Sequence, residues 1–211
     1  MPHAARAARG AGVDGVEVHA ANGYLPHQFL SPATDHRTDA YGGDPLARVR
    51  FVTEVADAVG KAIGADRVGI RVSPGINLHG ALEEEPHETA GTYQALVDQL
   101  SAPGLAYLHT IGDPGEPLVK DLLDRFTGST LVNTGWEPVT DPATATELTG
   151  PGRADVIAVG RPFIADPDLV TRWRNGRPLG NADPATIYGG DPRGYTDHPR
   201  YDQPGHAAPV S

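Results

Sequence analysis

The chain has 211 residues, of which 39% are hydrophobic, and its formal net charge is -10. This length suits one domain with a substantial core, and the negative charge argues against nucleic acid and anionic membranes as partners. The absence of cysteine excludes disulfides, thiolate metal ligands and a cysteine nucleophile.

Short apolar runs alternate with helical patterns along the chain. The first residues contain no long apolar run, so we expect a helix there, no signal peptide, no membrane span and a cytoplasmic protein. Five runs rich in valine, isoleucine or leucine predict strands at 15–20, 67–73, 105–110, 129–135 and 154–160. Apolar spacing predicts helices at 46–63, 88–100 and 116–126, and two later helix starts are signalled by Asp141-Pro142 and Asp166-Pro167.

This alternation predicts parallel strands joined by right-handed crossovers. The nearly continuous apolar runs are typical of strands that are covered on both faces. From about residue 181 the chain becomes polar and rich in Gly, Pro and Asp, which predicts an extended tail over 181–211.

Polar residues and glycines collect at the carboxyl ends of the predicted strands. His19 ends the first strand, Arg71 the second and His109 the third, while Gly135 and Gly160 end the last two. This end carries the active site in (β/α)8 barrels, and it is the binding edge in open doubly wound sheets. The pattern therefore predicts a site but leaves both folds open.

The last two strands suggest an anion site. Gly135 and Gly160 follow consecutive strands, and Arg161 begins a short helix. Backbone amides and a guanidinium in this arrangement can bind phosphate. The alternative is that the glycines only make tight turns and Arg161 is a surface charge.

The stretch "GVEVHAANGYLPHQFLSP" (15–32) places three hydrogen-bonding side chains directly after the first strand. His19 and Asn22 could donate to one substrate oxygen, and Tyr24 could act as a general acid. The alternative is a satisfied histidine, an Asn-Gly turn and a packing tyrosine. Arg71 should be buried among apolar neighbours, so it needs a partner, either a cofactor or Glu17 on the neighbouring strand.

Longer motifs resemble the Old Yellow Enzyme family of FMN-dependent ene-reductases. They are "HAANGYL", "QFLSP", "RTDAYGG" and "RVRF", followed in the family's order by "VGIRVSP", "LAYLHT", "VIAVGRPFIADPDL" and "YGGDPRGYTDHP". The resemblance covers roughly residues 4–200. It implies a (β/α)8 barrel, of which residues 1–180 would be a partial barrel of five strands with covering helices.

The same resemblance implies an oxidoreductase that uses FMN, with NADPH or NADH as the hydride donor, to reduce the C=C bond of α,β-unsaturated carbonyl or nitro compounds. His19 and Asn22 would hold the substrate oxygen, and Tyr24 would protonate the α-carbon. Arg71 would lie against the flavin pyrimidine edge. The phosphate would be bound by Gly135, Gly160 and Arg161, and Tyr195 would line the substrate pocket.

The length departs from the family pattern. A barrel of this type has eight strands and about 250 residues, and the five strands predicted here resemble the last five. The chain could be a fragment, a degenerate remnant without flavin, or an association module that needs self-association or a second chain to complete the barrel. Nine histidines raise a metal-dependent hydrolase as another class, but no His-x-His pair lies on a strand, so we expect no metal site.

Overall fold

The computed structural model describes residues 1–135, 139–150, 154–188 and 191–202. These residues belong to two compact units. The first comprises 1–135 and 147–157, and the second comprises 136–146 and 158–211.

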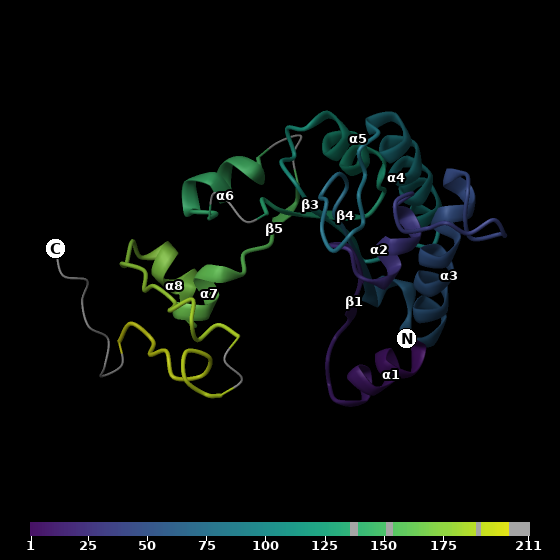
Figure 1. Ribbon diagram of the computed structural model, residues 1–211. Helices are drawn as coiled ribbons and strands as arrows, with labels where there is room; N and C mark the ends of the chain where they lie inside the picture. Colours follow the sequence, from purple (N-terminus) through teal and green to yellow (C-terminus); the bar gives the residue numbers. More distant parts are fainter. Residues whose placement is uncertain (136–138, 151–153, 189–190, 203–211) are drawn as a thin grey trace. The chain divides into compact units, whose positions relative to one another are not determined.

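The first unit contains a five-stranded parallel sheet with the order β1-β2-β3-β4-β5 (Figure 1). The strands are β1 (Val16–Ala20), β2 (Val68–Val72), β3 (Tyr107–Ile111), β4 (Ser129–Asn133) and β5 (Val156–Ile157). Each strand pairs with the next one in the chain, as in a (β/α)8 barrel, whereas a doubly wound sheet reverses its order at a switch point. The protein therefore has a partial (β/α)8 architecture. Five parallel strands are confirmed, although β5 is shorter than expected.

Helices precede, connect and follow these strands. They are α1 (Pro2–Gly10), α2 (Leu25–Leu30), α3 (Pro45–Ile63), a 3-10 turn η1 (Ala65–Arg67), α4 (Pro86–Ser101), α5 (Pro117–Arg125), α6 (Pro142–Leu148), α7 (Arg161–Ala165) and α8 (Leu169–Arg174). The Asp44 carboxylate caps α3 by accepting from the amides of Leu46 and Ala47. In α6 the expected start is confirmed, because Asp141 accepts from the Thr144 amide at 2.7 Å.

The expected helix start at Asp166-Pro167 is wrong. Helix α8 begins at Leu169, with Asp168 at the N-cap. The fully buried Asp166 instead forms an ion pair with Arg172 at 2.8 Å and accepts from the Gly180 amide. A buried carboxylate whose oxygens are taken by a guanidinium and a distant amide is not available to cap a helix.

The core lies between the sheet and helices α3, α4 and α5, which stand side by side (Figure 1). On the sheet, the helix-facing side chains of this core are Val18, Ala20, Val68, Ile70, Val72 and Leu108. Alternation along a strand places Glu17, His19, Arg71 and His109 on the opposite face. On this second face, charged and polar residues therefore interrupt the apolar runs. Among the described residues, no helix is long and apolar enough to cross a membrane.

Candidate functional site

The polar face of the sheet carries a row of three aligned residues. His19 pairs in register with Arg71, and Arg71 pairs with His109 on the next strand. His109 is buried, while His19 and Arg71 are partly exposed. The parallel register thus brings together two of the residues that the sequence predicts for the site.

The turn after β1 adds Asn22 and Tyr24. Asn22 adopts a left-handed backbone with φ 57°, and its amide donates to Ser73 Oγ at 2.8 Å, just beyond β2. Gly23 also has a positive φ, and a Cβ there would lie 2.3 Å from the carbonyl oxygen of Leu78. Only glycine permits this close approach between the turn and the loop after β2.

The Tyr24 ring lies against His19. Their ring centroids are 4.8 Å apart, and Tyr24 also contacts His79, at 5.7 Å, from the loop after β2. The Tyr24 residue retains 53% of its exposure. A half-exposed phenol beside a histidine can reach a molecule that occupies the polar face of the sheet.

Three of these residues contain a buried polar atom that lacks a hydrogen-bond partner among the described residues. The atoms are His19 Nδ1, Asn22 Oδ1 and Arg71 Nε. Buried polar atoms are nearly always paired in folded proteins, so an unpaired group requires an explanation. These three atoms lie within one predicted site, where a polar ligand or water can satisfy them.

Glu17 is not the partner of Arg71. Its carboxylate contacts His109 Nδ1 at 2.8 Å, and no hydrogen bond or ion pair joins it to Arg71 within the described part of the chain. Burial alone would raise the pKa of Glu17, but hydrogen bonding and the charge of His109 lower it overall. The sequence left a cofactor and Glu17 open as partners for Arg71. Glu17 makes no direct contact with it, although the Arg71 charge contributes to the lowered pKa of Glu17.

The pKa values of His19 and Tyr107, both on this face, are shifted. Burial, followed by the neighbouring Arg71 charge, lowers the pKa of His19 below its ordinary value. His19 is therefore neutral near pH 7 and can donate from only one ring nitrogen. Burial and the Glu17 carboxylate raise the pKa of Tyr107 to about 12.

The predicted phosphate-binding residues fall in both units. Gly135 follows β4 in the first unit with φ 88°, and its amide donates to Asn133 Oδ1 at 3.0 Å. In the second unit, Gly160 is the N-cap of α7, which begins at Arg161. Gly160 and Tyr195 both line a cavity of about 310 Å³ in that unit. Tyr195 itself retains 74% of its exposure.

Sequence reasoning missed two parts of this region. Helix α2 directly follows Tyr24, and the loop between β2 and α4 brings His79 and Glu83 to the turn. Six residues are too few for a helical period to stand out. The loop has no motif, and only its clustered polar residues could have drawn attention to it.

No group of three or more His, Cys, Asp or Glu side chains in the described part of the chain could hold a metal ion. The arrangement is instead one of hydrogen-bond donors, a phenol and a guanidinium around an open polar face. Such a set can hold an oxygen on which negative charge develops and can supply a proton beside it.

Comparisons with known proteins agree with this geometry. Residues 2–180 match the profile described as the NADH:flavin oxidoreductase / NADH oxidase family. The chain is 40% identical to "Putative 12-oxophytodienoate reductase 3" of Oryza sativa subsp. japonica, over 93% of this chain and 52% of that protein. It is also 40% identical to "Probable flavin mononucleotide-dependent alkene reductase" of Leishmania infantum, over 93% of this chain and 53% of that protein.

A solved structure of morphinone reductase in complex with tetrahydroNAD is similar, with a TM-score of 0.85 and 42% sequence identity. The match covers 98% of this chain and 55% of that one. The chain thus spans about half the length of the relatives that it matches.

Proposed function

Because the chain belongs to the NADH:flavin oxidoreductase / NADH oxidase family, we propose that it takes part in NADPH- or NADH-driven reduction of activated C=C bonds with FMN as cofactor. The substrates would be α,β-unsaturated carbonyl or nitro compounds. The observation that carries the proposal is the group His19, Asn22, Tyr24 and Arg71 on one sheet edge, three of them with buried unpaired atoms.

Arg71 fits a flavin on physical grounds. Its buried Nε is unpaired and Glu17 is engaged elsewhere, so a pyrimidine edge that accepts hydrogen bonds would satisfy it. The Gly135 amide fits a phosphate only after Asn133 releases it. Gly160 and Arg161, in the second unit, are the other residues that we propose for phosphate binding. FMN, when bound, would supply the hydride.

The remaining chemistry belongs to the side chains of the turn. His19 and Asn22 would donate to the carbonyl or nitro oxygen as negative charge develops on it. Because its pKa is lowered, His19 would do so as a neutral ring. Tyr24 would give its phenolic proton to the α-carbon, and Tyr195 would line the substrate pocket.

We also propose that residues 1–180 form the partial barrel and that 181–211 form an extended tail. The polar, Gly- and Pro-rich composition of that segment supports this division. The absence of cysteine is compatible with the cytoplasmic location that we propose.

The direct test is flavin binding. Residues 1–211 would be mixed with FMN, desalted and examined for bound flavin in the visible spectrum. A phenol such as 4-hydroxybenzaldehyde would then be titrated in to detect a long-wavelength band, and reduction by NADPH and by NADH would be compared before 2-cyclohexenone is added. Folded protein that retains no flavin would contradict the proposal for this chain alone.

A second candidate is an association module completed by another chain. Its support is the outer edge of β1, which pairs with no strand among the described residues, since an open sheet edge is a template for strand pairing. Light scattering would then show a self-associated species, or flavin binding would appear only after a second polypeptide with the remaining strands is added. A monomer that binds flavin by itself would contradict this candidate.

A further inference from the structure

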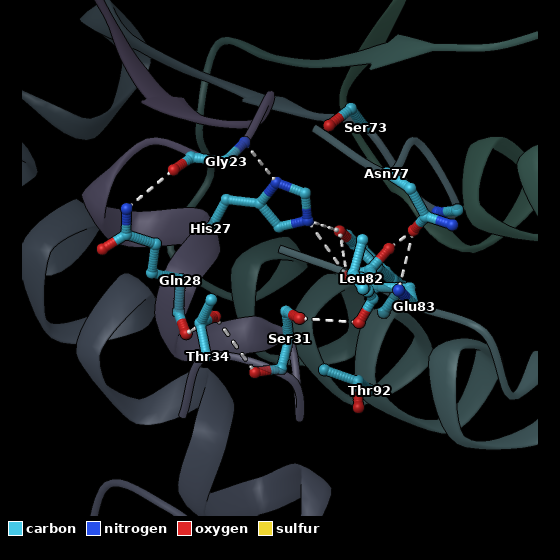
Figure 2. Close-up of polar contacts among 12 residues, drawn as sticks. Gly23, His27, Gln28, Ser31, Thr34, Ser73, Asn77, Leu82, Glu83 and Thr92 are labelled. Atoms are coloured by element: carbon cyan, nitrogen blue, oxygen red, sulfur yellow. Dashed lines mark hydrogen bonds and ion pairs between the residues drawn. The ribbon is translucent and has the colours of Figure 1, made fainter. Parts of the chain in front are cut away.

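A buried polar cluster lies directly behind the turn that carries Asn22 and Tyr24. It consists of His27 from α2, Glu83 from the loop before α4, and Tyr93 from α4 (Figure 2 shows the first two). His27 and Tyr93 are fully buried, and the Glu83 side chain retains 1% of its exposure. None of the three has a role in the chemistry proposed above.

Hydrogen bonds link the turn to the loop after β2 and converge on the Glu83 carboxylate from both sides. The Gly23 amide donates to His27 Nδ1 at 2.8 Å, so that nitrogen carries a lone pair and the proton of a neutral ring lies on Nε2. His27 Nε2 then donates to Glu83 Oε1 at 3.1 Å. Glu83 Oε2 accepts from the Gly75 amide at 2.7 Å, which brings the chain of bonds to the loop after β2.

Tyr93 completes the carboxylate's partners. Its hydroxyl donates to Glu83 Oε1 at 2.9 Å. Burial and the nearby Glu83 charge raise the pKa of Tyr93 well above its ordinary value, so the hydroxyl stays a donor. Both carboxylate oxygens are therefore satisfied, as a buried carboxylate requires.

Two further contacts hold the turn, α2 and the loop before α4 together. Ser31 Oγ donates to the carbonyl of Leu82 at 2.7 Å, and Gln28 Nε2 donates to the carbonyl of Gly23 at 2.8 Å (Figure 2). Both polar groups of the Gly23 backbone are thus held by side chains of α2. Gly23 lies between Asn22 and Tyr24, so the network acts on the two residues that would contact substrate.

We propose that His27 and Glu83 are positioning residues, which fix Gly23 and thereby hold Asn22 and Tyr24 in place beside His19. The effect of this positioning on catalysis rests on the proposed function. The positioning itself is a property of the chain without any cofactor.

The main variant is Glu83→Gln, which keeps the shape of the side chain. The glutamine amide has one oxygen and one NH2 group. Its NH2 group must face either the Gly75 N–H or the pair His27 and Tyr93, and both of these are donors as well, so at least one hydrogen bond is lost. The matched control is Thr92→Val. It removes the buried hydrogen bond of 2.9 Å from Arg48 Nη2 to Thr92 Oγ1, which does not reach Gly23.

The first readout is hydrogen exchange of the Gly23 amide by NMR in the chain without flavin. We expect Glu83→Gln to accelerate it about tenfold relative to Thr92→Val, the size expected for a lost hydrogen bond to a charged group. In the unmodified chain, 15N shifts should report a non-protonated Nδ1 in His27. Equal acceleration in both variants, or a protonated Nδ1 in a neutral His27, would overturn the proposal.

The second readout uses the flavin-loaded protein. Glu83→Gln should weaken 4-hydroxybenzaldehyde binding about tenfold, while the rate of flavin reduction by NADPH changes by less than about twofold. Equal losses in both steps would overturn the positioning role. If the unmodified chain binds no flavin, the proposed function fails for this chain alone, and the Gly23 exchange rates still decide the positioning role.

Discussion

Two neighbouring polar regions of the first unit treat their hydrogen bonds in opposite ways. In the cluster behind the turn, the Glu83 carboxylate has a partner for each oxygen and His27 has a partner for each ring nitrogen. On the polar sheet face and the turn beside it, His19, Asn22 and Arg71 each have a buried atom without a partner in the described residues. A satisfied network stabilises the fold, whereas an unsatisfied one is available to a ligand.

The largest expected effect tests the exposed side of this comparison. Tyr24→Phe removes only a hydroxyl from a half-exposed ring, so stability should not change. Loss of a general acid should slow reduction of 2-cyclohexenone about 10²–10⁴-fold, while reduction of the flavin by NADPH is spared. Stopped-flow measurement of the two half-reactions checks this, and equal losses in both would contradict a proton-donor role.

The next effect separates the two regions by stability. Glu83→Ala leaves His27, Tyr93 and the Gly75 amide without their acceptor, and we expect the free energy of unfolding to fall by about 3–5 kcal/mol. Arg71→Met removes a guanidinium whose Nε is unpaired and keeps a long, unbranched side chain. The free energy of unfolding should therefore change by less than about 0.5 kcal/mol. Urea unfolding of both variants is the measurement. Similar losses would mean that the two regions do not differ as argued.

A smaller effect isolates the Asn22 side chain from its backbone. Asn22→Gly keeps the left-handed conformation available and removes the amide, whereas Asn22→Ala adds a backbone strain of about 1 kcal/mol. Both variants should slow enone reduction about 10²-fold by losing a donor to the developing oxyanion. Only Asn22→Ala should also lower stability. Normal activity in Asn22→Gly would show that the backbone, rather than the side chain, matters.

Features of the fold and the site could be predicted from sequence where the interacting residues are close together in the chain. Strands and most helices follow from local periodicity, and the positions of His19, Arg71 and His109 follow from where strands end. The buried cluster does not follow from local patterns. His27 is 56 positions from Glu83 and 66 positions from Tyr93 in the sequence. No local pattern marks such a pairing. The predicted cap at Asp166 was wrong for the same reason, since its partners, Arg172 and Gly180, lie beyond the signal.

The smallest expected effect is the pH dependence of stability from His19. Its pKa is lowered in the folded chain, first by burial and then by Arg71, relative to an ordinary value of 6.5. Protons therefore bind the unfolded chain more readily, and stability is lost as the pH falls through about 6.5. Because solvent screens this partly exposed ring, the contribution should be under about 0.5 kcal/mol.

The measurement compares urea unfolding at about pH 7.5 and about pH 5.5 in the unmodified chain, in His19→Gln and in a control variant. His19→Gln should lose less stability on acidification than the unmodified chain, and His3→Gln, on the exposed surface of α1, should behave like the unmodified chain. The lowered pKa of Glu17 also makes stability fall on acidification, but only below its ordinary value of 4.5, which is outside the pH range compared. A greater acid loss in His19→Gln would mean that the ring gains a proton-stabilising partner in the fold, contrary to its unpaired Nδ1.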